Sequence, residues 1–165
     1  LHKPIDSAYR IACDIVLSTR FEIEDSLVLA NNDKILLLSG SGVQGNNPTA
    51  CAAEGNARYL VMIRKGKIIC KNPCAVLSKS ETMNDPFERM YPVKNGFGLS
   101  FEWGSADYKN YTFEFARNAK KEYVLQKWSF YGFNKANPSK SIVHQFNQPK
   151  PADVKHFKVR KYLMY

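Results

Sequence analysis

The chain has 165 residues, of which 44% are hydrophobic and 13% aromatic, and it carries a formal net charge of +9. This composition is typical of a globular protein with a core and excludes an intrinsically disordered chain. No apolar run reaches the roughly 18 residues that a membrane-spanning helix needs, so we expect a single domain over residues 1–165 without a membrane span.

The positive charge is concentrated near the C-terminus. Residues 1–116 contain 13 Lys or Arg and 13 Asp or Glu, whereas residues 117–165 contain 11 basic and 2 acidic residues. A basic segment of this kind favours an acidic partner, such as nucleic acid, an anionic membrane surface, a cell-wall polymer or an acidic protein. A merely solvated surface is the alternative, because the lysines are scattered along the segment and not clustered.

An amphipathic helix is predicted over residues 5–19. Asp6 or Ser7 can cap its N-terminus by accepting hydrogen bonds from backbone N–H groups of the first turn. The apolar residues follow the helical spacing i, i+3, i+4 and i+7, at Ala8, Ile11, Ala12 and Ile15. One face of this helix is therefore expected to pack on the rest of the fold.

Two hairpins are predicted after the helix. Residues 21–40 contain two apolar runs separated by Asn31, Asn32 and Asp33, which tolerate the left-handed backbone of a tight turn. Residues 58–70 repeat the pattern with Gly66 at the turn. A further short strand is predicted over residues 75–80.

A long glycine-rich loop separates the two hairpins over residues 39–56, SGSGVQGNNPTACAAEGN. It does not match a phosphate-binding loop, because no Gly-Lys-Ser/Thr follows its glycines. Long loops often carry function, whereas a plain connection is the alternative. The residues predicted to bind a partner are Ser39, Ser41, Val43, Gln44, Asn46 and Asn47.

The segment from Pro92 to Phe133 is predicted to form the core sheet as three consecutive strands. Leu99, Phe101 and Trp103 alternate with polar residues, as in a half-buried strand. The same alternation recurs over residues 111–115, and the last run, from residue 123, is apolar on both faces and is therefore expected to be central. The pair Asn95-Gly96 favours a two-residue hairpin turn.

Two more elements are predicted beyond the core sheet, a short strand over residues 142–146 and a basic edge strand or strand-like tail over residues 154–165. The predicted fold class is mainly β (α+β), an antiparallel sheet or a sandwich of hairpins with one N-terminal helix.

Four cysteines allow two disulfides. Cys70 and Cys74 flank a proline-containing turn and could form a local bridge, which would leave Cys13 and Cys51 for a second one. Zinc binding has weak support, because no second Cys/His pair lies near the three-residue gap, and buried free thiols are another alternative. We favour at least one disulfide, which indicates an oxidising compartment. The chain begins with Leu, so we expect a removed signal peptide and a periplasmic or secreted protein.

The sequence contains no recognisable catalytic motif, and we expect neither a cofactor nor a metal. The three histidines lack the helical spacing of a metal site. An enzymatic alternative is a secreted protein acting on an anionic polymer, with Glu102 or Glu114 and His144 as acid and base. The basic aromatic run over residues 120–133 could also stack nucleic-acid bases, but core packing explains its aromatic residues more simply.

Residues 84–133 carry a resemblance to a known class of proteins. The stretch Asn84-Asp85-Pro86-Phe87, then YTFEF over residues 111–115 and EYVLQKW over residues 122–128, resembles the tail region of small bacterial periplasmic proteins. Some of these are immunity proteins against cell-wall-degrading effectors of the type VI secretion system. The resemblance covers about a third of the chain.

The resemblance implies a non-catalytic inhibitor that inserts a loop into the active site of a secreted, amidase-type effector. No inhibitory residue can be carried over, so the inserting loop is assigned to residues 40–48 from its length and glycine content. The predicted function is a periplasmic binding protein of the immunity type. The alternative is an enzyme or binding module acting on nucleic acid or a cell-wall polymer.

Overall fold

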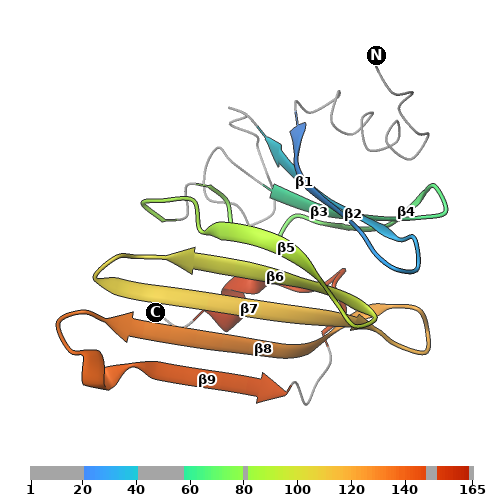
Figure 1. The fold of residues 1–165 in the computed structure, drawn as a ribbon. Helices are drawn as coiled ribbons and strands as arrows, with labels where there is room; N and C mark the ends of the chain where they lie inside the picture. The colour runs from blue at the N-terminus through green and yellow to red at the C-terminus, as the bar shows by residue number, and fades with distance from the viewer. Residues whose placement is uncertain (1–20, 41–57, 80–81, 148–151, 164–165) are drawn as a thin grey trace.

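The computed structural model describes residues 21–40, 58–79, 82–147 and 152–163. They form two antiparallel sheets with the strand orders β1-β2-β3-β4 and β5-β6-β7-β8-β9 (Figure 1). The first sheet consists of β1 (Phe21–Val28), β2 (Lys34–Gly40), β3 (Arg58–Arg64) and β4 (Lys67–Asn72). The second consists of β5 (Phe87–Val93), β6 (Gly96–Trp103), β7 (Asp107–Arg117), β8 (Tyr123–Asn134) and β9 (Ile142–Asn147). Two short 3-10 helices, η1 (Pro138–Lys140) and η2 (Val159–Tyr162), complete the described part.

The mainly β fold class is thereby confirmed, with two antiparallel sheets. The predicted helix over residues 5–19 lies outside the described residues. The described part of the chain contains no helix with the length and apolarity that crossing a membrane would require.

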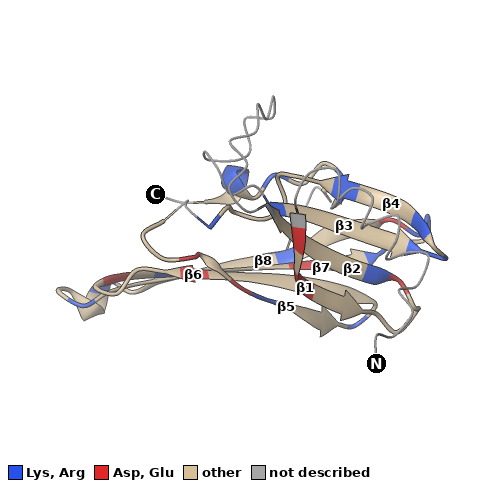
Figure 2. Ribbon diagram, turned by 90° about the horizontal axis from the view of Figure 1, so that it is seen from above, with Lys and Arg blue, Asp and Glu red and all other residues tan. Residues whose placement is uncertain are grey.

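The two sheets form two layers around a shared hydrophobic core, as the view from above shows (Figure 2). Leu37 and Leu60 of the first sheet belong to the same buried cluster as Phe97 and Phe115 of the second. The rings of Phe97 and Phe115 stack with their centroids 5.1 Å apart. Each such side chain contributes about 1.5–3 kcal/mol when fully buried, so the predicted alternation in β6 and β7 describes the inner face of the second sheet.

The hairpin turns adopt the backbone that their residues favour. Asn32 (φ 65°), Asn95 (φ 59°) and Gly66 (φ 75°) lie in the left-handed region, which Asn and Gly tolerate best. The predicted hairpins over residues 21–40 and 58–70 are confirmed. A tight turn also forms at Asn95, but its two residues are Lys94 and Asn95, because Gly96 is the first residue of β6 and pairs with Val93. The prediction that the last apolar run is central is also confirmed, because β8 pairs with β7 on one side and with β9 on the other.

Two strand predictions are wrong. Residues 75–79 contain no strand, and the segment 152–163 contains one isolated bridge and η2 in place of an edge strand. For the segment 152–163 the reason is hydrogen bonding to a distant side chain: Asn72 Nδ2 donates to the carbonyls of Val154 (2.6 Å) and Phe157 (2.8 Å). The alternating apolar residues still face inwards, but a side chain, and not a neighbouring strand, satisfies these carbonyl groups.

The predicted bridge between Cys70 and Cys74 is wrong, because Cys70 carries a free thiol. Cys74 is disulfide-bonded, and no disulfide has both of its cysteines within the described residues. Cys13 and Cys51 lie outside these residues. The number of disulfides therefore stays a prediction, which the mass of the protein with and without reductant would test.

The Cys70 thiol is expected to be unreactive in the folded protein. Its residue is 4% exposed, and burial, together with the nearby charge of Asp153, raises its pKa to about 12. Because the thiolate is the nucleophile, iodoacetamide at pH 7.5 should leave Cys70 unmodified in buffer and label it fully in denaturant. Peptide mass spectrometry measures both states, and rapid labelling in buffer would contradict the buried position.

Candidate functional site

The turns of four hairpins lie at the same end of the molecule, on the right in Figure 1. They are the β1–β2, β3–β4, β5–β6 and β7–β8 turns, which come from both sheets. Residues from three of them, the β1–β2, β3–β4 and β7–β8 turns, surround a cavity of about 560 Å³. We call this cavity the turn pocket.

Asp33 joins the three turns that form the turn pocket. Its carboxylate accepts hydrogen bonds from Arg64 Nη2 (2.7 Å) and from the hydroxyl of Tyr123 (2.8 Å). Arg64 Nη2 also donates to the backbone carbonyl of Lys121 (3.0 Å) in the β7–β8 turn. Asn31 Nδ2 contacts both Asp33 (3.0 Å) and the Tyr123 oxygen (2.9 Å). This Asp33 network therefore fixes the first sheet against the second.

The ionisation of Asp33 follows from these partners. Burial alone would raise the pKa of its carboxyl, but hydrogen bonds from Arg64 and Tyr123 outweigh it and lower the pKa below its usual value of 3.8. The hydrogen bond to Asp33 raises the pKa of Arg64. Burial, and then the same carboxylate, raise the pKa of Tyr123. Asp33 is consequently an anion at neutral pH, although its residue is only 2% exposed.

The turn pocket is rich in positive charge. Among the described residues that line it, Asp33 is the single acidic one, and its charge is paired with Arg64. The basic residues of the lining are Lys34, Arg64, Lys65, Arg117 and Lys121. Lys and Arg also gather at this end in the ribbon viewed from above (Figure 2). The pocket therefore offers a site for an anionic group.

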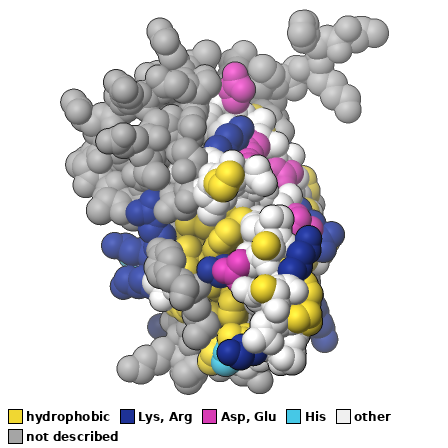
Figure 3. Space-filling view, turned by 90° about the vertical axis from the view of Figure 1, so that its left-hand side faces the viewer, with side chains coloured by type: hydrophobic (Ala, Val, Ile, Leu, Met, Phe, Trp, Pro, Cys, Tyr) yellow, Lys and Arg dark blue, Asp and Glu magenta, His cyan; other side chains and the backbone are white. Residues whose placement is uncertain are grey.

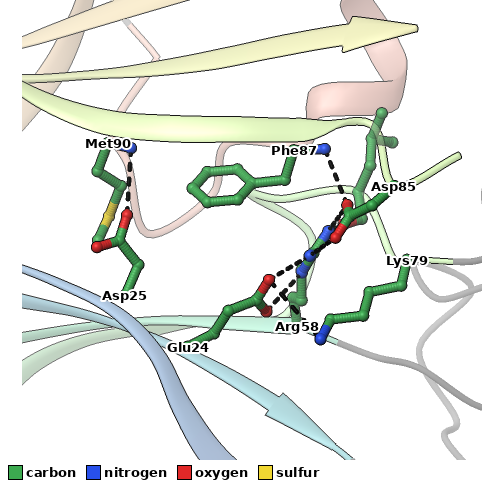
Figure 4. A network of polar contacts seen from close by, with 8 residues as sticks. Glu24, Asp25, Arg58, Lys79, Asp85, Phe87 and Met90 are labelled. Atoms are coloured by element: carbon green, nitrogen blue, oxygen red, sulfur yellow. Dashed lines mark hydrogen bonds and ion pairs between the residues drawn. The ribbon is translucent and has the colours of Figure 1, made fainter.

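A second polar network surrounds Arg58 at the start of β3 (Figure 4). Arg58 Nε donates to Glu24 (2.9 Å), and Nη1 donates to Asp85 (2.6 Å) and to the carbonyl of Leu77 (3.0 Å). Its guanidinium lies over the ring of Phe87, 5.3 Å from the centroid. The Arg58 side chain is 0% exposed, and every partner belongs to the protein itself. We assign this Arg58 network a structural role.

A third feature is an exposed apolar surface on β8 and β9, at the end opposite the turn pocket. Val143 is 70% exposed, Ile142 48% and Tyr131 39%. Tyr131 and Val143 are direct cross-strand neighbours. Figure 3, viewed from this end, shows hydrophobic side chains at the surface in its lower half, where β8 and β9 lie. We call Tyr131, Ile142 and Val143 the edge patch.

The predicted partner-binding residues are only partly described. Ser39 lies in β2, opposite Glu22 and Arg58 in the sheet, and is 8% exposed. Its side chain thus presents little surface to a partner. Ser41, Val43, Gln44, Asn46 and Asn47 lie outside the described residues. Of the predicted inserting loop over residues 40–48, only Gly40 is described, and it is the last residue of β2.

The proposed acid–base arrangement does not assemble. His144 stacks between Phe130 and Phe146 on the inner face of the second sheet. Glu102 and Glu114 alternate with buried residues of β6 and β7 and so lie on the opposite face. Within the described ranges no three His, Cys, Asp or Glu side chains are close enough to hold a metal ion.

The basic residues of the turn pocket were not predicted as a group. Arg64, Lys65 and Lys121 are visible in the sequence only as turn residues. Alternate turns of consecutive hairpins lie at the same end of a sheet, so hairpin order alone would have grouped the β1–β2 turn with the β3–β4 turn. Arg117 and Lys121 join the turn pocket because the second sheet packs on the first, and no local sequence pattern indicates that packing.

Comparisons with models of protein families, with curated proteins and with solved structures gave no match for this chain.

Proposed function

We propose that this protein is a non-catalytic binding protein that blocks a cell-wall-degrading effector enzyme by protein–protein contact, as an immunity protein does. The observation that supports the proposal is the edge patch on β8 and β9. An apolar surface on an open sheet edge is a typical site for association with another polypeptide chain.

The four edge strands of the two sheets differ in how they resist such association. Natural sheets protect their edges with charged residues and proline. Three edges follow this rule: β1 with Glu22, Glu24 and Asp25, β4 with Lys67 and Lys71, and β5 with Glu88, Arg89 and Pro92. β9 reads IVHQFN and contains neither a charged residue nor proline. Its sequence therefore favours pairing with a partner.

The mode of binding that fits β9 is addition of a partner strand to the sheet. Within the described residues β9 pairs only with β8, so its outer edge presents backbone N–H and C=O groups. In this mode main-chain hydrogen bonds supply affinity, and alternate side chains supply specificity. Val143 and its cross-strand neighbour Tyr131 would contact apolar side chains of the partner. The Tyr131 ring also packs edge-on against the Tyr108 ring, with the two centroids 6.1 Å apart.

The compartment belongs to the same proposal. A partner that degrades the cell wall acts in the periplasm, which agrees with a periplasmic or secreted protein. The predicted inserting loop over residues 40–48 would contribute to inhibition in addition to the contacts of β9, or instead of them. The experiment below distinguishes a contact at β9 from a contact at the loop.

A photo-cross-linking amino acid at Val143 tests the proposal in the native host. We expect one dominant adduct with an envelope protein, and that protein, once purified, should hydrolyse peptidoglycan and be inhibited by the wild-type chain. Val143→Lys should weaken inhibition at least about tenfold, because a charge in an apolar contact is costly to desolvate. Val28 is the matched control: it is 60% exposed on β1, an edge that carries acidic residues, and should give no such adduct.

Equal adducts at Val143 and Val28 would contradict a role for the edge patch. If Val143→Lys inhibits the effector enzyme as well as the wild-type chain does, the contact with that enzyme lies elsewhere. The same cross-linking amino acid placed at residue 44 would then test whether the loop makes the contact. Hydrolysis of RNA, DNA or peptidoglycan by the purified chain alone would support the enzymatic alternative and overturn the proposal.

A further inference from the structure

We propose that the turn pocket binds a small phosphate-bearing ligand through Lys65, Arg117 and Lys121. The pocket lies at the end of the molecule opposite the edge patch, so this inference does not depend on the proposed function (Figure 1).

Within the described residues, nothing neutralises the charges of these three side chains. In the part of the chain that the structure describes, Arg64 is paired with Asp33, whereas the side chains of Lys65, Arg117 and Lys121 form neither an ion pair nor a hydrogen bond. The Nε atom of Arg117 is also buried without a hydrogen-bond partner. Buried donors normally have partners, so the unpaired Nε of a residue that lines a cationic pocket agrees with an anionic ligand there.

The backbone of the two lysines supports the same inference. Lys65 has φ 48° and Lys121 has φ 64°, a left-handed conformation that Asn and Gly adopt more easily than Lys does. The turns at Asn32 and Asn95 use the favoured residue. Unfavourable backbone conformations cluster at functional sites, and here they place two ammonium groups at one pocket.

The shape of the surface indicates what the ligand carries besides phosphate. A neighbouring cavity of about 500 Å³ shares Asn31, Arg117 and Lys121 with the turn pocket. Its lining adds Pro92 and Val93, which are apolar. A compact organic group can occupy this second cavity while its phosphate lies among the cations.

Phosphate fits the charge better than a carboxylate does. A phosphomonoester carries nearly two negative charges at neutral pH and has three acceptor oxygens. A guanidinium can bind two of these oxygens at once, and a lysine acts as a point charge. A dianion therefore neutralises two of the three unpaired positive charges, whereas a monoanion neutralises one.

Phenyl phosphate, inorganic phosphate and benzoate serve as probes, with affinities measured by isothermal titration calorimetry at constant ionic strength. We expect phenyl phosphate to bind most tightly, inorganic phosphate less tightly and benzoate most weakly. The double variant Lys65→Asn/Lys121→Asn should weaken phenyl phosphate binding at least about tenfold, since each lysine contributes a charged contact. Its melting temperature should equal or exceed that of wild type, because Asn suits both backbone positions.

The matched control removes two lysines at the opposite end, Lys135→Gln/Lys140→Gln, and should leave the affinity unchanged. Equal loss of affinity in both double variants would mean that overall charge binds the anion, and it would overturn the inference. Absence of phenyl phosphate binding to the wild-type chain would overturn it as well. Neither outcome affects the cross-linking result at Val143, so the two proposals fail separately.

Discussion

Replacing Arg58 with alanine is expected to lower the free energy of unfolding by about 3–5 kcal/mol, because removing one partner of a buried ion pair leaves uncompensated charge. Glu24 and Asp85 would both lose the guanidinium that binds them. Burial alone would raise the pKa of Asp85, but hydrogen bonds from Arg58 and the Phe87 N–H hold it below its usual value. The loss therefore combines unpaired carboxylates with an empty volume in the protein interior.

Urea denaturation followed by fluorescence of the two tryptophans measures this loss. Arg58→Lys should be intermediate, because lysine keeps the charge but not the planar group that binds two carboxylates. Arg89→Ala is the matched control: its side chain is 65% exposed beside Glu88, and the change should stay within about 0.5 kcal/mol. A similar effect of both alanine variants would contradict the structural role of the Arg58 network.

Acid is expected to destabilise the protein through Asp33. The folded-state pKa of Asp33 is lowered, so its contribution to stability is complete above the unfolded-state value of about 3.9. The contribution is lost as the pH falls from that value through the folded-state pKa. At pH 7, Asp33→Asn should cost about 2–3 kcal/mol, as expected for hydrogen bonds to a charged group.

The difference between wild type and Asp33→Asn should narrow as the pH is lowered from 5 to 2, since the wild-type carboxylate becomes protonated. Asp85 also has a lowered pKa, but it is present in both proteins, so comparing them isolates Asp33. Asp107→Asn, at a side chain 66% exposed, should change stability little at any pH. A pH-independent difference for Asp33→Asn would show that its charge is not what stabilises the Asp33 network.

Local features of the fold could be predicted from the sequence, because they depend on neighbouring residues. Asn95 and Gly66 adopt the left-handed backbone that their turns need, and the alternation around Phe113 specifies which face of β7 is buried. The segment after residue 152 could not be predicted, because its carbonyl groups bind Asn72, 82 and 85 residues earlier in the chain. An alternating pattern shows which residues point inwards, but not which groups satisfy the backbone.

Less of the candidate sites than of the fold could be predicted from the sequence. The exposed short strand over residues 142–146 was predicted, but exposure of Val143 requires knowing that β9 is an edge. The excess of basic residues after Arg117 suggested a charged surface confined to the C-terminal segment. The turn pocket instead combines Arg117 and Lys121 with residues from the electrically neutral part of the chain. Only the packing of one sheet on the other brings these groups together.

The arginines at the two ends of β3 have a consequence for folding kinetics. Arg58 binds residues 34 and 27 positions away, and Arg64 binds residues 31 and 57 positions away. Each hairpin can form from local contacts, and the pairs Arg58–Glu24 and Arg64–Asp33 lie within the first sheet. The hydrogen bonds from Arg64 to the Lys121 carbonyl and from Tyr123 to Asp33 form only when the two sheets meet. Closing such long loops slows folding, as in other proteins dominated by contacts between distant residues. We infer that docking of the sheets at β3, and not formation of the hairpins, limits the folding rate.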